Sequence, residues 1–179
     1  MPRIEIIEIG RHDRSAKRRS TTRGGSTNPI GLKKNLRAME IAKENRLPLI
    51  NLVESGGADL PTQSEIFIPG GRTFYNITEM SGLGIPTVAL VFGNSTAGGA
   101  YVPGMSDYVV MIDQRSKVFL GGPPLVKMAT GEESDDESLG GAEMHASVTG
   151  LGEYLADNDA HAIALTRDLV DKLQWDAVR

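Results

Sequence analysis

The chain has 179 residues, of which 40% are hydrophobic and 23% charged. This length and composition fit one globular α/β domain with a buried core, and they exclude collagen, a coiled coil and wholesale disorder. No stretch reaches the roughly 18 apolar residues that a membrane span needs. The chain has no cysteine, which excludes disulfides, thiolate metal sites and a cysteine nucleophile. We therefore expect a cytoplasmic protein that does not act in a membrane.

The net charge of -4 conceals an uneven distribution. Residues 1–25 hold seven Lys or Arg against three Asp or Glu, so the rest of the chain is acidic and offers no basic face for nucleic acid. The basic stretch suits a nucleic-acid arm, a transit peptide or a solvated tail. Glu5 and Glu8 disfavour the transit peptide. We predict a disordered basic tail over residues 1–23 and a folded domain over 24–179.

The first half of the domain reads as helix, strand, helix, strand. A helix begins at Pro29 with Asn28 as its cap and stops before Pro48. A buried strand follows at 49–53 and runs into the glycine loop 54–59. A second helix is predicted over 72–83, and a second buried strand over 87–92 leads into another glycine loop at 93–100, which we expect to enter a helix.

The second half is less regular. Strands are predicted at 108–112 and 117–120, a short helix at 123–129, and an amphipathic helix at 160–173. The acidic patch 132–137 is interpreted as a solvated loop leading into a short helix, with cation binding as the less favoured alternative. Alternation of helices with buried strands predicts a parallel sheet, whose carboxyl edge is where ligands bind in open α/β folds.

Several common sites are excluded or weakly indicated. Leu32 stands where a phosphate-binding loop needs lysine, and Gly82-Leu83-Gly84 follows a helix instead of a strand, so neither nucleotide motif is convincing. The histidines stand singly, without a partner at the spacing of a metal site, and are interpreted as surface or packing residues: His12, His145 and His161. No metal is expected in this chain.

The two glycine loops are the informative features. In each, a Gly-Gly-Ala stretch ends a buried strand, and free backbone N–H groups at such a point can meet a negative charge. Two such groups converging from different loops make an oxyanion hole. The candidate donors are the Ala58 N–H, with Gly57 beside it, and the Gly99 N–H, with Gly98 beside it. The alternative is that these glycines only permit tight turns and close packing.

At these loops the sequence resembles the paired oxyanion loops of the crotonase superfamily. Over a longer stretch, from about Gly24 to Leu173, the sequence is similar to the carboxyltransferase (β) subunits of biotin-dependent acyl-CoA carboxylases. Within that family it is closest to the methylcrotonoyl-CoA carboxylase branch. The stretches that carry this resemblance lie in order at 55–60, 71–76, 95–103, 119–127, 139–142 and 157–160.

The resemblance implies a crotonase-like ββα spiral domain, incomplete, because family subunits are more than twice this length. Residues 24–179 would form part of the N-domain, the acyl-CoA-binding half. The implied reaction moves CO2 from carboxybiotin to the enolate of an acyl-CoA of the methylcrotonoyl, propionyl or acetyl type. Partners would be a biotin carboxylase and biotin carboxyl carrier, together with a C-domain or another copy of the subunit in a homo-oligomer. Residues expected to line the substrate or CoA channel are Gly56, Ala100, Tyr101, Gly121, Gly122 and Pro123.

Three alternative functions share the implied fold or its loops. A Clp-type serine peptidase shares the implied fold, but Ala97 stands at the position of its nucleophile and Asp113 at that of its histidine. A biotin-dependent acyl-CoA decarboxylase would use the same loops and run the carboxyl transfer in the reverse direction. An inactive fragment that serves as a binding module is the third.

Overall fold

The computed structural model describes residues 25–175 and arranges them in three layers. The middle layer is a five-stranded sheet in which every strand pair is parallel. Its order is β1-β2-β3-β5, and β4 pairs with the end of β2. The strands are β1 (Leu49–Ser55), β2 (Thr87–Thr96), β3 (Tyr108–Ile112), β4 (Lys117–Phe119) and β5 (Tyr154–Ala156).

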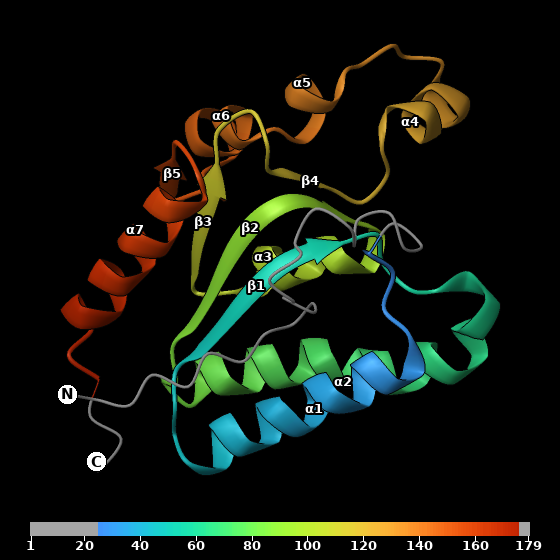
Figure 1. The fold of residues 1–179 in the computed structure, drawn as a ribbon. Helices are drawn as coiled ribbons and strands as arrows, with labels where there is room; N and C mark the ends of the chain where they lie inside the picture. The colour runs from blue at the N-terminus through green and yellow to red at the C-terminus, as the bar shows by residue number, and fades with distance from the viewer. Residues whose placement is uncertain (1–24, 176–179) are drawn as a thin grey trace.

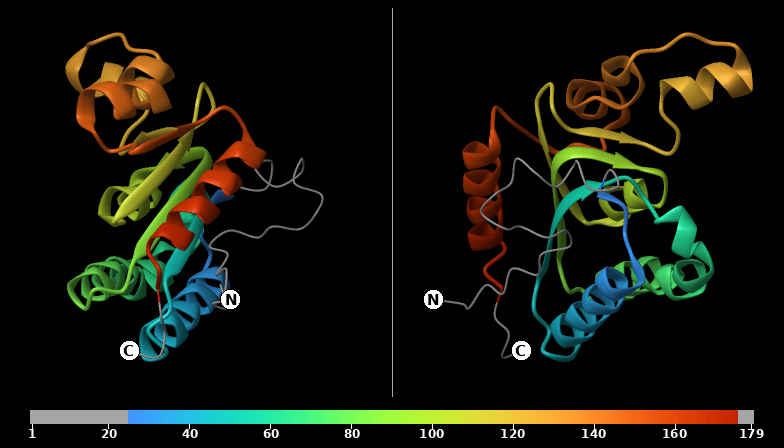
Figure 2. Two further views of the ribbon diagram at one scale, coloured as in Figure 1. Left: turned by 90° about the vertical axis from the view of Figure 1, so that its left-hand side faces the viewer. Right: turned by 45° about the vertical axis from the view of Figure 1, so that its right-hand side comes forward.

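Helices cover both faces of this sheet. Figure 2 shows α1 (Pro29–Glu44) and α2 (Gln63–Gly82) on one side and α7 (Asp159–Lys172) on the other. Two apolar clusters match these layers: side chains of β1, such as Leu49 and Val53, pack with α1 and α2, whereas Ile50 packs with α7. Side chains that alternate along one strand thus enter two cores, as expected for a sheet buried on both faces.

The helix α1 forms as the sequence predicts. Asn28 caps it: its side-chain oxygen accepts a hydrogen bond from the Gly31 N–H at 2.7 Å. Pro29 occupies the first helical position, where its missing N–H costs nothing. The helix ends at Glu44, short of Pro48.

The helix α2 is longer than predicted, because it begins at Gln63 instead of residue 72. Pro69-Gly70-Gly71 is a helix-breaking sequence, yet it lies inside the helix. The segment before it is held by tertiary contacts: Ile66 is buried, and a Cβ atom on Gly70 would lie within 4.0 Å of both Ile66 and Leu32 of α1. Packing against a neighbouring helix therefore overrides the local signal.

The other predicted elements are confirmed with small changes of boundary. β1 extends to Ser55, β2 extends to Thr96, β3 matches its prediction, and β4 stops at Phe119. The predicted short helix is α4 (Pro123–Thr130). The helix predicted after the second glycine loop is formed by the 3₁₀ helix η3 (Ala97–Ala100) and by α3 (Tyr101–Met105). Elements that the sequence did not predict individually are α6 (Ala142–Met144), the π-helix η4 (His145–Thr149), β5 and the 3₁₀ helix η2 (Leu60–Thr62).

The acidic patch precedes a short helix, as predicted. This helix is α5 (Asp136–Gly140), and Asp135 caps it through hydrogen bonds from the backbone N–H groups of Glu137 and Ser138. These bonds and the Ser138 hydroxyl lower the pKa of Asp135, the hydroxyl having the largest effect. The patch therefore serves local structure.

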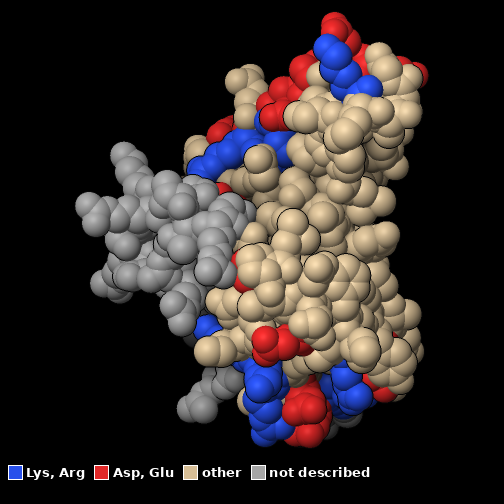
Figure 3. Space-filling model, turned by 90° about the vertical axis from the view of Figure 1, so that its right-hand side faces the viewer, with Lys and Arg blue, Asp and Glu red and all other residues tan. Residues whose placement is uncertain are grey.

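One face of the molecule is nearly free of charge. In Figure 3 a broad area lacks Lys, Arg, Asp and Glu, and charged side chains gather mainly above and below it. This face looks onto the region where α2 begins and α4 lies. Both helices expose large apolar side chains. Ile68 of α2 is 88% exposed and Met128 of α4 is 78% exposed. No helix among residues 25–175 is long and apolar enough to cross a membrane.

Candidate active site

Three glycine-containing segments meet at one edge of the sheet. β1, β2 and β4 run parallel, and their ends are in register: Ser55 pairs with Ser95, and Thr96 pairs with Phe119. The chain leaves all three strands at this edge. The structure thereby brings to one edge the predicted site residues Gly56, Gly57, Ala58, Gly98, Gly99, Ala100, Tyr101, Gly121, Gly122 and Pro123.

The first two loops touch each other so closely that side chains are excluded. A Cβ atom on Gly57 would lie 3.1 Å from the Ala97 Cβ, and Gly57 also has a φ of +90°. A Cβ atom on Gly99 would lie 2.8 Å from the Ser55 Oγ. Glycine is therefore required at both positions, by space and, at Gly57, by backbone conformation as well.

The first loop presents one unused donor. The Thr27 N–H donates to the Gly57 carbonyl at 2.7 Å, and the Gly57 N–H donates to the Ser55 Oγ at 3.1 Å. Because the peptide unit is planar and trans, the Ala58 N–H points away from the carbonyl that Thr27 holds. No hydrogen bond within residues 25–175 uses the Ala58 N–H. The unused backbone N–H of this loop is therefore that of Ala58, the residue that the sequence singled out.

The second loop forms the 3₁₀ helix η3, which begins at Ala97 with Thr96 as its cap. In a 3₁₀ helix the N–H of each residue bonds the carbonyl three residues earlier. This pattern assigns the Gly99 N–H to the Thr96 carbonyl and leaves the Gly98 N–H without an intrahelical acceptor. The geometry thus favours Gly98 as donor over Gly99, which the sequence singled out.

Ala97 has an unusual backbone. Its φ of +50° lies in the left-handed region, which is strained for a residue with a Cβ atom. The turn directs the chain from β2 into η3 and places the Gly98 nitrogen 3.7 Å from the Cβ position of Gly57. The strain therefore occurs at the point where the two loops meet.

An aromatic pair borders the second loop. The Tyr101 ring lies 5.3 Å from the Phe74 ring, and Tyr101 is 46% exposed. The Phe74 ring end is 4.0 Å from the Cβ position of Gly98. Tyr101 therefore lies near the predicted site, together with Phe74, to which the sequence assigned no functional role.

The third segment is more peripheral. A Cβ atom on Gly121 would lie 2.6 Å from the Leu125 side chain. Gly122 occupies the N-cap position of α4 and, as a glycine, has no side chain to bond the helix. Pro123 lines a shallow hollow between α4 and the loop that follows it, with Pro124, Lys127, Glu133 and Ser134. The exposed Leu125 side chain can move aside, so packing does not require glycine at residue 121, and only its place at the edge supports a role in binding.

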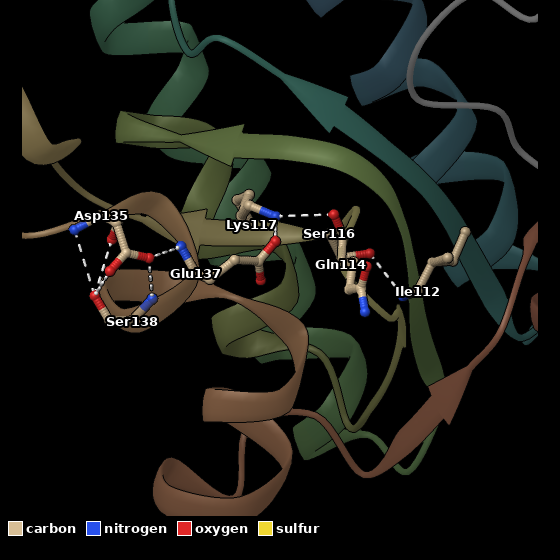
Figure 4. A network of polar contacts seen from close by, with 7 residues as sticks. All are labelled: Ile112, Gln114, Ser116, Lys117, Asp135, Glu137 and Ser138. Atoms are coloured by element: carbon tan, nitrogen blue, oxygen red, sulfur yellow. Dashed lines mark hydrogen bonds and ion pairs between the residues drawn. The ribbon is translucent and has the colours of Figure 1, made fainter.

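A polar network lies beside this edge (Figure 4). The Lys117 ammonium group, whose side chain is 10% exposed, bonds the Glu137 carboxylate and the Gln114 carbonyl. The Ser116 hydroxyl donates to the Val91 carbonyl and accepts from the Ile112 N–H. These bonds join the loop after β3 to β2 and α5, so the network is structural.

The described part of the chain contains no group of three metal-ligating side chains. Both ring nitrogens of the buried His145 are bonded, to the Thr149 hydroxyl and the Val118 carbonyl, and His161 bonds Asp157. These contacts match the packing and surface roles predicted for the two residues. His12 lies outside the described residues.

The arrangement does not suit a serine peptidase. Ala97 has the strained turn of a nucleophile position but carries only a methyl group. Asp113 lines a separate hollow with Gln114, Glu137 and Glu143. The buried Ser95 hydroxyl donates to the Gly99 carbonyl at 2.9 Å, and no base bonds it among the described residues. The sequence-based argument against a peptidase is thus supported.

Sequence reasoning missed the residues that hold the loops in place. These are Thr27, Ser55 and Ser95. Thr27 bonds the loop backbone through its own N–H, and the two serines bond it through their hydroxyls. All three contacts depend on strand register. The one local signal was Ser55 itself, since a serine directly before Gly-Gly can accept a turn N–H.

The chain is similar to known proteins over most of its length. The carboxyl transferase domain family matches residues 8–177. The probable biotin-dependent acyl-coenzyme A carboxylase beta2 subunit of Mycobacterium tuberculosis is 70% identical over 87% of this chain and 29% of its own length. The probable mitochondrial methylcrotonoyl-CoA carboxylase beta chain of Drosophila melanogaster is 51% identical over 88% of this chain and 28% of its own length.

A solved structure is also similar. The beta subunit of geranyl-CoA carboxylase from P. aeruginosa superposes with a TM-score of 0.81 at 52% identity, covering 88% of this chain and 30% of that one. The chain therefore spans less than a third of the length of these relatives. Its match extends over nearly all of its own residues, and the chain belongs to the carboxyl transferase domain family.

Proposed function

We propose that this chain is the acyl-CoA-binding part of a carboxyltransferase in a biotin-dependent acyl-CoA carboxylase. The observation that carries the proposal is the contact between the two glycine loops, with the Ala58 N–H unbonded at their meeting point. The family and the relatives support the same conclusion. Substrates are proposed from the methylcrotonoyl, propionyl and acetyl types of acyl-CoA.

The chain's contribution is an oxyanion hole. As the acyl-CoA becomes an enolate, negative charge collects on its thioester oxygen, and the N–H groups of Ala58 and Gly98 would donate hydrogen bonds to it. Donors that are already fixed stabilise this charge without reorganising, and one such donor is worth about 3 kcal/mol in well-studied hydrolases. The strained Ala97 turn and the Thr27 contact hold the two donors in place.

Carboxybiotin, brought by a partner protein, would supply CO2 and a nitrogen that accepts the substrate proton. This chain then needs no base of its own, in keeping with the histidine contacts above. Gly56, Gly99 and Ala100 shape the two loops, and Tyr101, Gly121, Gly122 and Pro123 are proposed to line the path of the acyl or CoA chain. The other half of the site would come from a C-domain or from a second copy in a homo-oligomer.

The test uses the complete subunit with its biotin-carrying partners. Transfer of labelled CO2 from carboxybiotin to a panel of acyl-CoAs is measured for the unmodified protein, for Ala97→Gly and for the double variant Ala97→Gly/Gly98→Pro. The double variant carries Ala97→Gly because the residue before proline avoids helical conformations, and residue 97 has a φ of +50°. Gly98→Pro removes a donor and should lower turnover by roughly 10²–10³-fold relative to Ala97→Gly, while unfolding stays cooperative.

Controls separate the alternatives. Ala97→Gly alone is the reference for the proline variant. Normal turnover by a folded Gly98→Pro protein would contradict the oxyanion assignment. Net CO2 release from a carboxylated acyl-CoA, coupled to a membrane pump in place of an ATP-using biotin carboxylase, would identify a decarboxylase. Absence of transfer in both directions would identify an inactive binding module.

A further inference from the structure

Two serine hydroxyls lie behind the glycine loops, one at the end of each strand. Ser55 of β1 and Ser95 of β2 are register partners, and the pairing is irregular just before them, between Val53 and Ser55. The irregularity places more residues on β2 than on β1, as in a β-bulge. The two serines are thus the last register pair between β1 and β2 before the chain enters the loops.

Ser95 restrains the second loop. It is fully buried, and its hydroxyl donates to the Gly99 carbonyl at 2.9 Å. A Gly-Gly pair has little conformational preference of its own, so the direction of the Gly98 N–H is set by what holds the residues on either side. Ala97 is held by its turn, and Gly99 is held by Ser95.

Ser55 contacts both loops. Its hydroxyl accepts the Gly57 N–H at 3.1 Å, which fixes the peptide preceding the one that carries the Ala58 donor. Its side chain also fills the space in which a Gly99 Cβ atom would lie. Ser55 therefore sets the separation of the two loops as well as the direction of the first.

We propose that Ser55 and Ser95 are positioning residues that hold the Ala58 and Gly98 N–H groups at the separation and direction needed to bind one oxygen. The Ser95 hydroxyl is not a donor to the substrate, because it donates to the Gly99 carbonyl, and Ser55 acts by accepting the Gly57 N–H. This inference rests on the proposed function, since it assumes that the two N–H groups bind the thioester oxygen.

The test compares Ser95→Ala and Ser55→Ala with Ser106→Ala in the complete subunit with its biotin-carrying partners. Ser106 is a matched control, because its hydroxyl also donates to a backbone carbonyl, that of Val102, at 2.8 Å, but lies outside both loops. Loss of one restraining hydrogen bond should lower kcat by roughly tenfold in each loop variant, with KM for acyl-CoA nearly unchanged. The control should lose stability and keep its kcat.

A spectroscopic readout separates positioning from folding. Hydrogen bonds to the thioester oxygen lower the stretching frequency of the carbonyl, which infrared spectroscopy of a ¹³C-labelled acyl-CoA bound to the enzyme detects. The shift should be smaller in Ser95→Ala and Ser55→Ala than in the unmodified protein and Ser106→Ala. Ser95→Thr and Ser55→Thr retain the hydroxyl, and either one that folds should recover the shift.

The outcomes are distinct. An unchanged kcat and an unchanged carbonyl shift in folded Ser95→Ala and Ser55→Ala would overturn the inference and leave the oxyanion hole standing. If Ser95→Ala does not fold, Ser55→Ala decides by the same two readouts. Absence of both transfer and carbonyl shift in the unmodified protein would overturn the proposed function, and this inference with it.

Discussion

Replacing Gly57 by alanine tests the closest contact between the two loops. The new methyl group would lie 3.1 Å from the Ala97 Cβ and 3.4 Å from the Thr96 carbonyl oxygen. Residue 57 also has a φ of +90°, which a residue with a Cβ atom adopts only at a cost. The substitution therefore combines backbone strain with overpacking.

The two costs can be sized separately. A left-handed backbone costs an L-residue about 1–2 kcal/mol. Overpacking by one methyl group adds about 1–3 kcal/mol. Gly57→Ala should thus reduce the free energy of unfolding by about 2–5 kcal/mol. Gly84→Ala is the matched control, because Gly84 has a φ of +68° but nothing within 4 Å of its Cβ position, so only the first cost applies.

A double-mutant cycle with Ala97→Gly isolates the contact. This second substitution removes the methyl group that Gly57→Ala would strike and also relieves the strain at Ala97, whose φ is +50°. Urea denaturation of the four proteins should give a coupling energy of about 1 kcal/mol or more, with the double variant more stable than the sum of the single effects predicts. In the complete enzyme, Gly57→Ala should also lower turnover, because it pushes the donors apart.

Two results would refute this reasoning. Additivity within about 0.5 kcal/mol would mean that residues 57 and 97 do not touch. An equal loss of stability in Gly57→Ala and Gly84→Ala would mean that the clash is absent and only backbone strain matters.

Three further predictions follow from features outside the loops. Asn51 is fully buried, and neither its amide oxygen nor its amide nitrogen has a hydrogen-bond partner within the described residues. Asn51→Leu should therefore raise the free energy of unfolding, measured by urea denaturation, by about 1–3 kcal/mol. A loss of stability would show that the amide is hydrogen-bonded. Because the pKa of Asp135 is lowered in the folded protein, its cap stabilises α5 fully above the unfolded-state pKa, and this stabilisation is lost as the pH falls through the folded-state pKa. An NMR titration of the Ser138 amide should detect the loss of the cap. An amide signal that does not move would contradict this. Since α2 and α4 expose the large apolar side chains of Ile68 and Met128, the isolated 179-residue chain should self-associate in sedimentation and show no transfer. An active monomer would disprove both expectations.

Much of the fold could be predicted from residue order. The Asn28-Pro29 start of α1, the apolar strand cores and the glycine loops behind them are local signals, and each has a local physical cause. A buried parallel strand must be apolar on both faces, and a tight turn after it needs glycine, so a short stretch suffices to identify the pair. This is why the predicted glycine-loop residues all lie at one edge of the sheet.

Other features depend on contacts between distant residues. α2 continues through Pro69-Gly70-Gly71 because its first half packs on α1, which local propensity does not reveal. The choice between Gly98 and Gly99 as donor follows from where η3 begins, and the roles of Ser55 and Ser95 follow from the register that makes them partners. An oxyanion hole is made of backbone N–H groups, which every residue except proline has. Residue types therefore indicate where such a hole is sterically allowed. The direction of each N–H is set by its peptide plane, and the pairing of β1 with β2 orients these planes.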